Sequence, residues 1–270
     1  MKLRQFPKWS TQFILILVTF FICFLNFQPH TWLTGWDNLH PEFNLLAELK
    51  RPLFSVWVEY RGLGLLGGMA HAAALPQILI YLLASPLLSH APHLYRYFWT
   101  FSMYILGALG VYHLASHTLL SRFSKRTRKF AAFFAGLFYA LNLGTIQVFF
   151  LPFETFTTFH GVFPWLLLVS ASYLNKPSKK NFLLLSLLLF FSGTAFYVQT
   201  MFLVFLICLL PTLITHIKKL LPVSCLLFTI FLTQAYWLLP NLYFTLNSST
   251  VTIEATQNQI ATRETVGRNH

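Results

Sequence analysis

The sequence predicts an all-α membrane protein, a polytopic transmembrane helical bundle with about seven crossings. Of its 270 residues, 56% are hydrophobic and 10% are charged, whereas soluble domains carry about 25% charged residues. A soluble fold of this length cannot bury so much apolar surface, so lipid must solvate much of it. The net charge of +12 does not indicate a nucleic-acid-binding face, because the basic residues form short clusters between apolar runs, as in cytoplasmic loops of membrane proteins.

The first apolar run covers residues 13–27 and follows Lys2, Arg4 and Lys8. A basic start before an apolar run is also typical of a signal peptide, but no small-x-small cleavage site follows this run. We therefore expect an uncleaved first membrane helix with a cytoplasmic N-terminus.

Residues 28–93 are predicted to form a long first external loop. Within it, residues 43–58 have an amphipathic pattern that is typical of an interfacial helix. The apolar segment 76–88 has 13 residues, which rise about 20 Å as a helix against a hydrocarbon core of about 30 Å. Because prolines also flank this segment, we expect a re-entrant or interfacial helix that does not cross the membrane.

Six further crossings are expected from the remaining apolar segments. The segments are residues 94–119, 130–150, 156–174, 182–193, 197–215 and 220–239. Residues 181–216 hold either two helices with a break near residues 192–194 or one long helix, and two helices keep Lys218 and Lys219 on the cytoplasmic side. If segment 76–88 does not cross, 13 of the 19 Lys and Arg residues fall on the cytoplasmic side, and all seven acidic residues fall outside. Such a one-sided distribution is what the positive-inside rule requires.

The predicted organisation is a transmembrane domain over residues 1–245 and a polar external tail over residues 246–270. The tail has neither a terminal anchor nor a closing helix in its sequence. We expect it to be the start of a longer external region.

Asp37 is the first candidate for chemistry, and it lies between Trp36 and His40 just beyond the first helix. A carboxyl group beside aromatic side chains at a membrane boundary is partly desolvated, which suits a general base. The alternative is helix capping, in which Asp37 caps the helix that begins near Pro41 and Glu42 favours its positive N-terminus.

Glu154 is the only acidic residue between residues 60 and 253, in a short external loop rich in aromatic residues. A carboxylate at membrane depth is costly and needs water, a cation or a partner. The candidates are Arg61, Arg96 and a bound substrate, and simple exposure at the interface is the alternative. Arg61 itself suits phosphate binding, although it also lies beside Glu59 and can neutralise nearby carboxylates.

Three other patterns are weak indications of a site. Residues 62–67 fit G-x-G-x-x-G, but a dinucleotide site needs a strand before the motif and a helix after it in a soluble domain. His113 and His117 have a spacing that suits two metal ligands, yet no third ligand is near in the sequence. The three cysteines all lie inside apolar runs, which favours packing over disulfides or metal binding.

Four pieces of the sequence carry a resemblance to a known family. They are Gly35-Trp36-Asp37, the segment PEFNLL at residues 41–46, WVEYRGLG at 57–64 and AYWLLPNL at 235–242. Together with the long first loop and its short helix, they resemble the GT-C superfamily of membrane glycosyltransferases that use polyprenyl-phosphate-linked sugars. The resemblance is greatest to the bacterial arabinofuranosyltransferase and to related uncharacterised membrane proteins, and it covers most of residues 1–245.

The resemblance implies transfer of a sugar from a polyprenyl-phosphate donor to an extracytoplasmic glycan or lipid acceptor, at a bacterial inner membrane. Asp37 and Glu154 then correspond to the acidic residues of the first and second external loops. Arg61 corresponds to a positively charged residue near the donor phosphate. Trp36, His40 and Glu42 would bind substrate beside Asp37. The stricter members of the superfamily have Asp-x-Asp in these loops, and this sequence does not. No metal ligand is therefore assigned, and a divalent cation stays an open alternative. The alternative is a non-enzymatic membrane protein, either a lipid or polymer transporter or an assembly scaffold.

Overall fold

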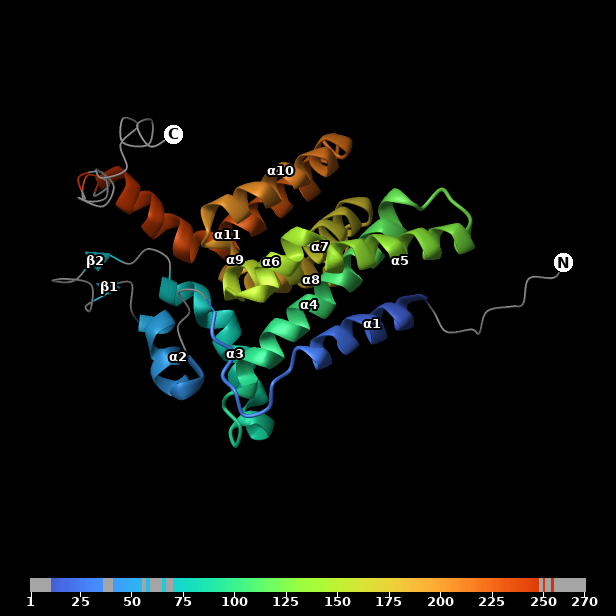
Figure 1. Ribbon diagram of the computed structural model, residues 1–270. Helices are drawn as coiled ribbons and strands as arrows, with labels where there is room; N and C mark the ends of the chain where they lie inside the picture. Colours follow the sequence, from blue (N-terminus) through green and yellow to red (C-terminus); the bar gives the residue numbers. More distant parts are fainter. Residues whose placement is uncertain are drawn as a thin grey trace, which may run out of the picture.

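The computed structural model describes residues 11–35, 41–54, 57–58, 65–66, 70–247, 250 and 254. Within them the chain is almost entirely helical (Figure 1). The elements in order are α1 (Thr11–Leu25), η1 (Pro41–Phe43), α2 (Leu45–Phe54), β1 (Trp57–Val58), β2 (Leu65–Leu66), α3 (Ala70–Leu88), α4 (Leu94–Leu114), the π-helical η2 (Ala115–Leu119), α5 (Lys125–Leu141), α6 (Leu143–Phe150), α7 (Glu154–Asn175), α8 (Lys179–Phe191), α9 (Gly193–Phe196), α10 (Gln199–Thr215) and α11 (Leu220–Asn247). The two strands form one short antiparallel pair, so the predicted all-α class is confirmed.

Short polar side chains set several of the helix boundaries. Ser124 accepts a hydrogen bond from the Thr127 backbone N–H and caps α5, and Ser178 does the same for α8 through Asn181. Asn142 ends α5 and caps α6, because its Oδ1 accepts from the Thr145 N–H at 3.1 Å. Asparagine is among the preferred N-cap residues. The segment 130–150, expected as one helix, is therefore two helices bent by 45°.

The parallel pair α4 and α7 forms the centre of the fold. The Trp99 indole N–H donates to Thr158 Oγ1 at 3.0 Å, and the Trp165 indole N–H donates to the Leu106 carbonyl at 2.8 Å. Gly161 lies so close to Met103 that a Cβ atom there would come within 3.0 Å of the Met103 Cα. Small residues let two helix backbones approach, which is a common way for membrane helices to pack.

Two hydrophobic clusters meet at α4. The larger includes Trp99, Phe196, Phe205 and Trp237 and extends over α3, α4 and α7–α11. The smaller joins α1, α4 and α5 around Tyr104, Ala108 and Ala132. Helix α4 therefore holds the first helix against the rest of the bundle.

Large apolar side chains also cover much of the outer surface. Examples from five helices are Phe24 at 63% exposed, Phe138 at 73%, Leu183 at 60%, Leu203 at 56% and Phe228 at 64%. Two helices, Leu94–Leu119 and Leu220–Asn247, are long and apolar enough to cross a membrane, and a third span results if α5 and α6 count as one. The predicted seven crossings are thus confirmed only in their coarser form, as a helical bundle with apolar helices that could span a membrane.

Contacts at the helix ends fix the direction of α1 relative to α4. At one end, Thr11 Oγ1 is hydrogen-bonded to Tyr112 Oη at 3.0 Å. At the other end, Thr31 Oγ1 is hydrogen-bonded to Tyr97 Oη at 2.8 Å. The two helices are therefore antiparallel, and the chain between Leu25 and Leu94 begins and ends at the same end of the bundle. We call this the acidic end, because Glu42 and Glu154 lie there, and the opposite one the basic end.

Helix α3 is longer than the sequence predicted. It begins at Ala70 and has 19 residues, with Pro76 and Pro86 inside it. Each of these prolines removes one backbone hydrogen bond without ending the helix. Nineteen residues rise about 28 Å, so the helix is longer than the 13 residues on which the length argument rested. Its apolar part, Ala73–Leu88, is still shorter than the helices that qualify as membrane spans among the described residues.

The position of α3 favours a helix that stays at the acidic end of the bundle. It packs mainly against α2 and against α9, the turn between α8 and α10, and Figure 1 shows it at the end of the bundle near α2. The Thr194 hydroxyl donates to the Ala73 carbonyl at 2.8 Å, which attaches α3 to that turn. The break that was expected near residues 192–194 is confirmed as α9.

Candidate functional site

Arg96 and Glu154 form a buried ion pair at the acidic end. Arg96 lies in the first turn of α4 and Glu154 is the first residue of α7. Because the two helices run parallel, these first turns are neighbours, and Arg96 Nη2 lies 2.5 Å from Glu154 Oε1. The side chains are 2% and 13% exposed. Of the partners expected for Glu154, the structure confirms Arg96.

The pair also holds the chain that leaves α1. Arg96 Nη1 donates to the Leu33 carbonyl at 3.2 Å. One guanidinium therefore links α4, α7 and the segment that leads toward Asp37. Arginine suits this role because its planar fork offers several donors in fixed directions.

Tyr81 brings α3 to the same place. Its side chain is fully buried, and its hydroxyl accepts a hydrogen bond from Gln77 Nε2 at 2.9 Å. Its ring packs against Tyr95 and Trp99 of α4, with centroids 5.1 and 6.1 Å apart. The hydroxyl interacts electrostatically with Glu154, Glu42 and Arg96.

Glu42 is the second carboxylate of this group. It lies in η1 and is only 6% exposed. Glu42 and Glu154 are far apart in sequence, yet the negative charges of both contribute to the electrostatic environment of the Tyr81 hydroxyl. We call Glu42, Gln77, Tyr81, Arg96 and Glu154 the Tyr81 cluster. It can orient hydroxyl groups or a cation and can exchange protons, because it combines carboxylates, a phenol and a guanidinium in a largely dry site.

The predicted site residues divide into two sets. Glu42 and Glu154 are described, largely buried, and both contribute to the electrostatic environment of Tyr81. Trp36, Asp37, His40 and Arg61 lie outside the described residues. Leu33, which Arg96 holds, is four residues from Asp37 in the chain.

Sequence reasoning missed Tyr81 and Gln77. Both lie in an apolar helix, four residues apart, so they share one face of it. Polar side chains on one face of an otherwise apolar helix were a usable indication that this face meets other polar groups.

Arg51 has a simpler role. It forms a partly buried ion pair with Glu48 at 2.5 Å, three residues away on α2, in which the Arg51 side chain is 41% exposed. This is a local helix pair of the kind that contributes little to stability.

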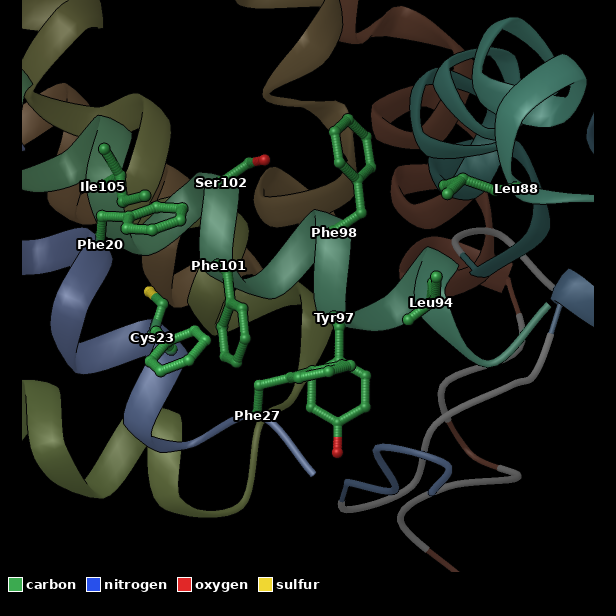
Figure 2. Close-up of a pocket in the computed structure, with 11 residues that line it drawn as sticks. Phe20, Cys23, Phe27, Leu88, Leu94, Tyr97, Phe98, Phe101, Ser102 and Ile105 are labelled. Carbon is green, nitrogen blue, oxygen red and sulfur yellow. The ribbon is translucent and has the colours of Figure 1, made fainter. Parts of the chain in front are cut away.

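An apolar groove of about 380 Å³ lies between α1 and α4, away from these charges. Figure 2 shows Phe20 and Cys23 from α1 facing Phe101 and Ile105 from α4. Ligand sites normally add a few convergent polar groups to an apolar wall. The groove offers mainly rings and aliphatic chains, so it is not part of the Tyr81 cluster.

The histidine pair gives no metal centre in the described part of the chain. The rings of His113 and His117 have centroids 5.6 Å apart, and His113 packs on Trp165. No group of three potential metal ligands occurs among the described residues. Cys23, Cys208 and Cys225 are free thiols.

No protein-family model matches the sequence, and comparisons with curated proteins and with solved structures give no match either. The fold and the Tyr81 cluster are therefore interpreted from their own chemistry.

Proposed function

We propose that this chain is an integral membrane glycosyltransferase of the GT-C type, which transfers a sugar from a polyprenyl-phosphate donor to an extracytoplasmic glycan or lipid acceptor. The observation that carries the proposal is the presence of two largely buried carboxylates, Glu42 and Glu154, at one end of an apolar bundle, where both contribute to the electrostatic environment of Tyr81. Two carboxylates from separate loops, beside a membrane surface, suit a reaction between a lipid-linked donor and a polar acceptor.

The proposed topology has seven crossings, by α1, α4, the α5–α6 pair, α7, α8, α10 and α11, with a cytoplasmic N-terminus in a bacterial inner membrane. Its support is the direction of the helices, since α1 and α4 are antiparallel and α3 lies at the acidic end. The exposed basic loops at the other end agree with the positive-inside rule. In this proposed topology the Tyr81 cluster lies on the extracytoplasmic side.

In the proposed reaction, the acceptor hydroxyl oxygen forms a bond to the anomeric carbon as the bond from that carbon to the donor phosphate breaks. Asp37 takes the proton of the hydroxyl as general base. Arg61 stabilises the polyprenyl phosphate that leaves. Glu154, fixed by Arg96, orients the acceptor or a divalent cation, and Trp36, His40 and Glu42 complete the binding site.

The alternative is a membrane scaffold without catalytic activity. One observation favours it: Arg96 and Glu154 are paired with each other, and Arg96 also holds the Leu33 carbonyl. These contacts are sufficient to hold three segments together without any catalytic role. Activity measurements separate the two proposals.

The test is sugar transfer by membranes that contain the full chain, with polyprenyl-phosphate pentoses and hexoses as donors. Asp37→Asn removes the general base but keeps the size of the side chain, and it is expected to lower transfer by about a hundredfold or more. Glu48→Gln is the matched control, because Glu48 is engaged by Arg51 on the surface of α2. Undiminished transfer by Asp37→Asn would remove Asp37 from the mechanism, and absence of transfer with every donor would favour the scaffold.

A further inference from the structure

The basic end of the bundle presents a strongly charged surface, formed by the loops at residues 122–129, 176–180 and 218–219. We call it the basic face. Arg122, Lys125, Arg126, Lys179 and Lys180 are among its exposed side chains. Glu42, Glu48 and Glu154 belong to the elements of the opposite end. The basic face therefore carries positive charge that these acids do not neutralise.

The three loops lie at the same end of the bundle, and two of them are in contact. Lys219 Nζ donates to the Leu174 and Asn175 carbonyls at 2.8 and 3.2 Å, and His216 Nε2 is hydrogen-bonded to Asn175 Oδ1 at 2.9 Å. The end of α7 thus meets the turn between α10 and α11. Because α4 runs parallel to α7, the loop after α4 is at the same end, as Figure 1 shows.

Two helices at this face begin with charges of unfavourable sign. Helices α5 and α8 each start after a serine cap, continue with Lys125-Arg126 and Lys179-Lys180, and have no acidic residue in the first turn. The N-terminal end of a helix is positive, so acidic residues are the stabilising choice there. The basic side chains add to the helix dipoles, and an external anion would offset both.

Exposed apolar side chains surround the same bases. Leu119 is 76% exposed, Phe123 57%, Phe130 60% and Leu221 75%. Aromatic side chains beside basic residues also suit a surface for single-stranded nucleic acid, but the aliphatic Leu119 and Leu221 offer no ring for base stacking. Basic side chains interspersed with exposed leucine and phenylalanine side chains are typical of a protein surface at the level of lipid headgroups.

We propose that the basic face is a binding surface for anionic phospholipids, whose phosphate groups contact the first turns of α5 and α8 while Leu119, Phe123 and Phe130 enter the adjoining acyl region. The inference is independent of the glycosyltransferase proposal. The positive-inside rule predicts only on which side of the membrane the basic residues lie. The present proposal adds that they bind anionic lipid there.

The first experiment uses the unaltered protein. It is reconstituted into nanodiscs of zwitterionic phosphatidylcholine, with or without phosphatidylglycerol, and its thermal unfolding is measured at low and high salt. Phosphatidylglycerol is expected to raise the Tm at low salt, and about 1 M salt, with a Debye length of about 3 Å, is expected to remove most of that rise. Inorganic phosphate added to phosphatidylcholine discs is expected to have little effect. Equal Tm values in all lipid mixtures would overturn the proposal, and an equal rise with inorganic phosphate would show a simple anion site.

The second experiment compares two triple variants. Lys125→Gln, Arg126→Gln and Lys179→Gln together remove three positive charges from the first turns of α5 and α8, whereas Lys125→Arg, Arg126→Lys and Lys179→Arg keep them. Native mass spectrometry in mild detergent then measures the affinity for phosphatidylglycerol. Affinity is expected to fall by about a hundredfold in the glutamine variant and to stay within about threefold in the charge-retaining one. Equal affinity in the two variants would contradict the proposal, and so would a preference of the unaltered protein for an added oligonucleotide over the lipid.

Discussion

Arg96 is a charged residue in the protein interior, with 2% of its surface exposed. Glu154 and the Leu33 carbonyl are two of the groups that it contacts. A buried ion pair is weak evidence for net stabilisation, because both ions lose their hydration, but the loss of one partner is costly. The pair is therefore a constraint on which variants of the site remain folded.

Glu154→Gln is expected to destabilise the protein by about 3 kcal/mol, because it leaves the Arg96 charge buried without its counter-ion. The measurement is unfolding in mild detergent. Glu48→Gln is the control, since its partner Arg51 is 41% exposed, whereas Arg96 is 2% exposed. Arg51 can regain water when the pair is lost, so the expected cost is less than about 1 kcal/mol. Similar decreases in the free energy of unfolding for Glu154→Gln and Glu48→Gln would show that burial of the Arg96–Glu154 pair does not affect stability.

A double-variant cycle sharpens this prediction. Arg96→Gln combined with Glu154→Gln removes both charges, so its loss of stability is expected to be smaller than the sum of the two single losses. Additive losses would mean that the two side chains act independently, despite their 2.5 Å contact.

Helices were easier to predict from the sequence than their ends. The expected segment 156–174 is α7, Glu154–Asn175, and the break near residues 192–194 is α9. Two boundaries were missed for a physical reason. Alanines before Pro76 extend α3 to Ala70, and Asn142 interrupts an apolar run because its side chain can cap the next helix. Hydropathy is insensitive to both effects.

The contact between α4 and α7 depends on glycines where the backbones meet. Gly161→Ala would place a Cβ atom 2.6 Å from Met103 Sδ and 3.0 Å from Met103 Cα. The helices would have to separate, so a loss of about 1–3 kcal/mol is expected in unfolding measurements.

Gly144→Ala is the matched control for this change. Its added Cβ atom would meet only Asn142 Oδ1, at 3.2 Å. Alanine also favours a helix more than glycine does, by about 1 kcal/mol. If Gly161→Ala is as well tolerated as Gly144→Ala, close packing of α4 on α7 does not limit stability.

At the scale of the whole molecule, the sequence predicted which groups lie at each end but not how they meet. Charge distribution alone placed Glu154 apart from the basic loops, and Arg96 was one of three expected partners. The contribution of Tyr81 and Gln77 was not predicted, because it depends on the packing of α3 across α4 and α9. Periodicity describes one helix at a time, whereas a site between helices depends on which of them are neighbours.

The central claim is that the bundle has a basic end and an acidic end on opposite sides of a membrane, with α3 confined to the acidic side. Single cysteines replace exposed residues at Gln28, Ser89 and Ser121, in a chain whose three native cysteines are changed to serine. A membrane-impermeant thiol reagent is then applied to intact cells. We expect Gln28→Cys and Ser89→Cys to react from outside and Ser121→Cys to react only after permeabilisation. Labelling of Gln28→Cys and Ser89→Cys from opposite sides would contradict it.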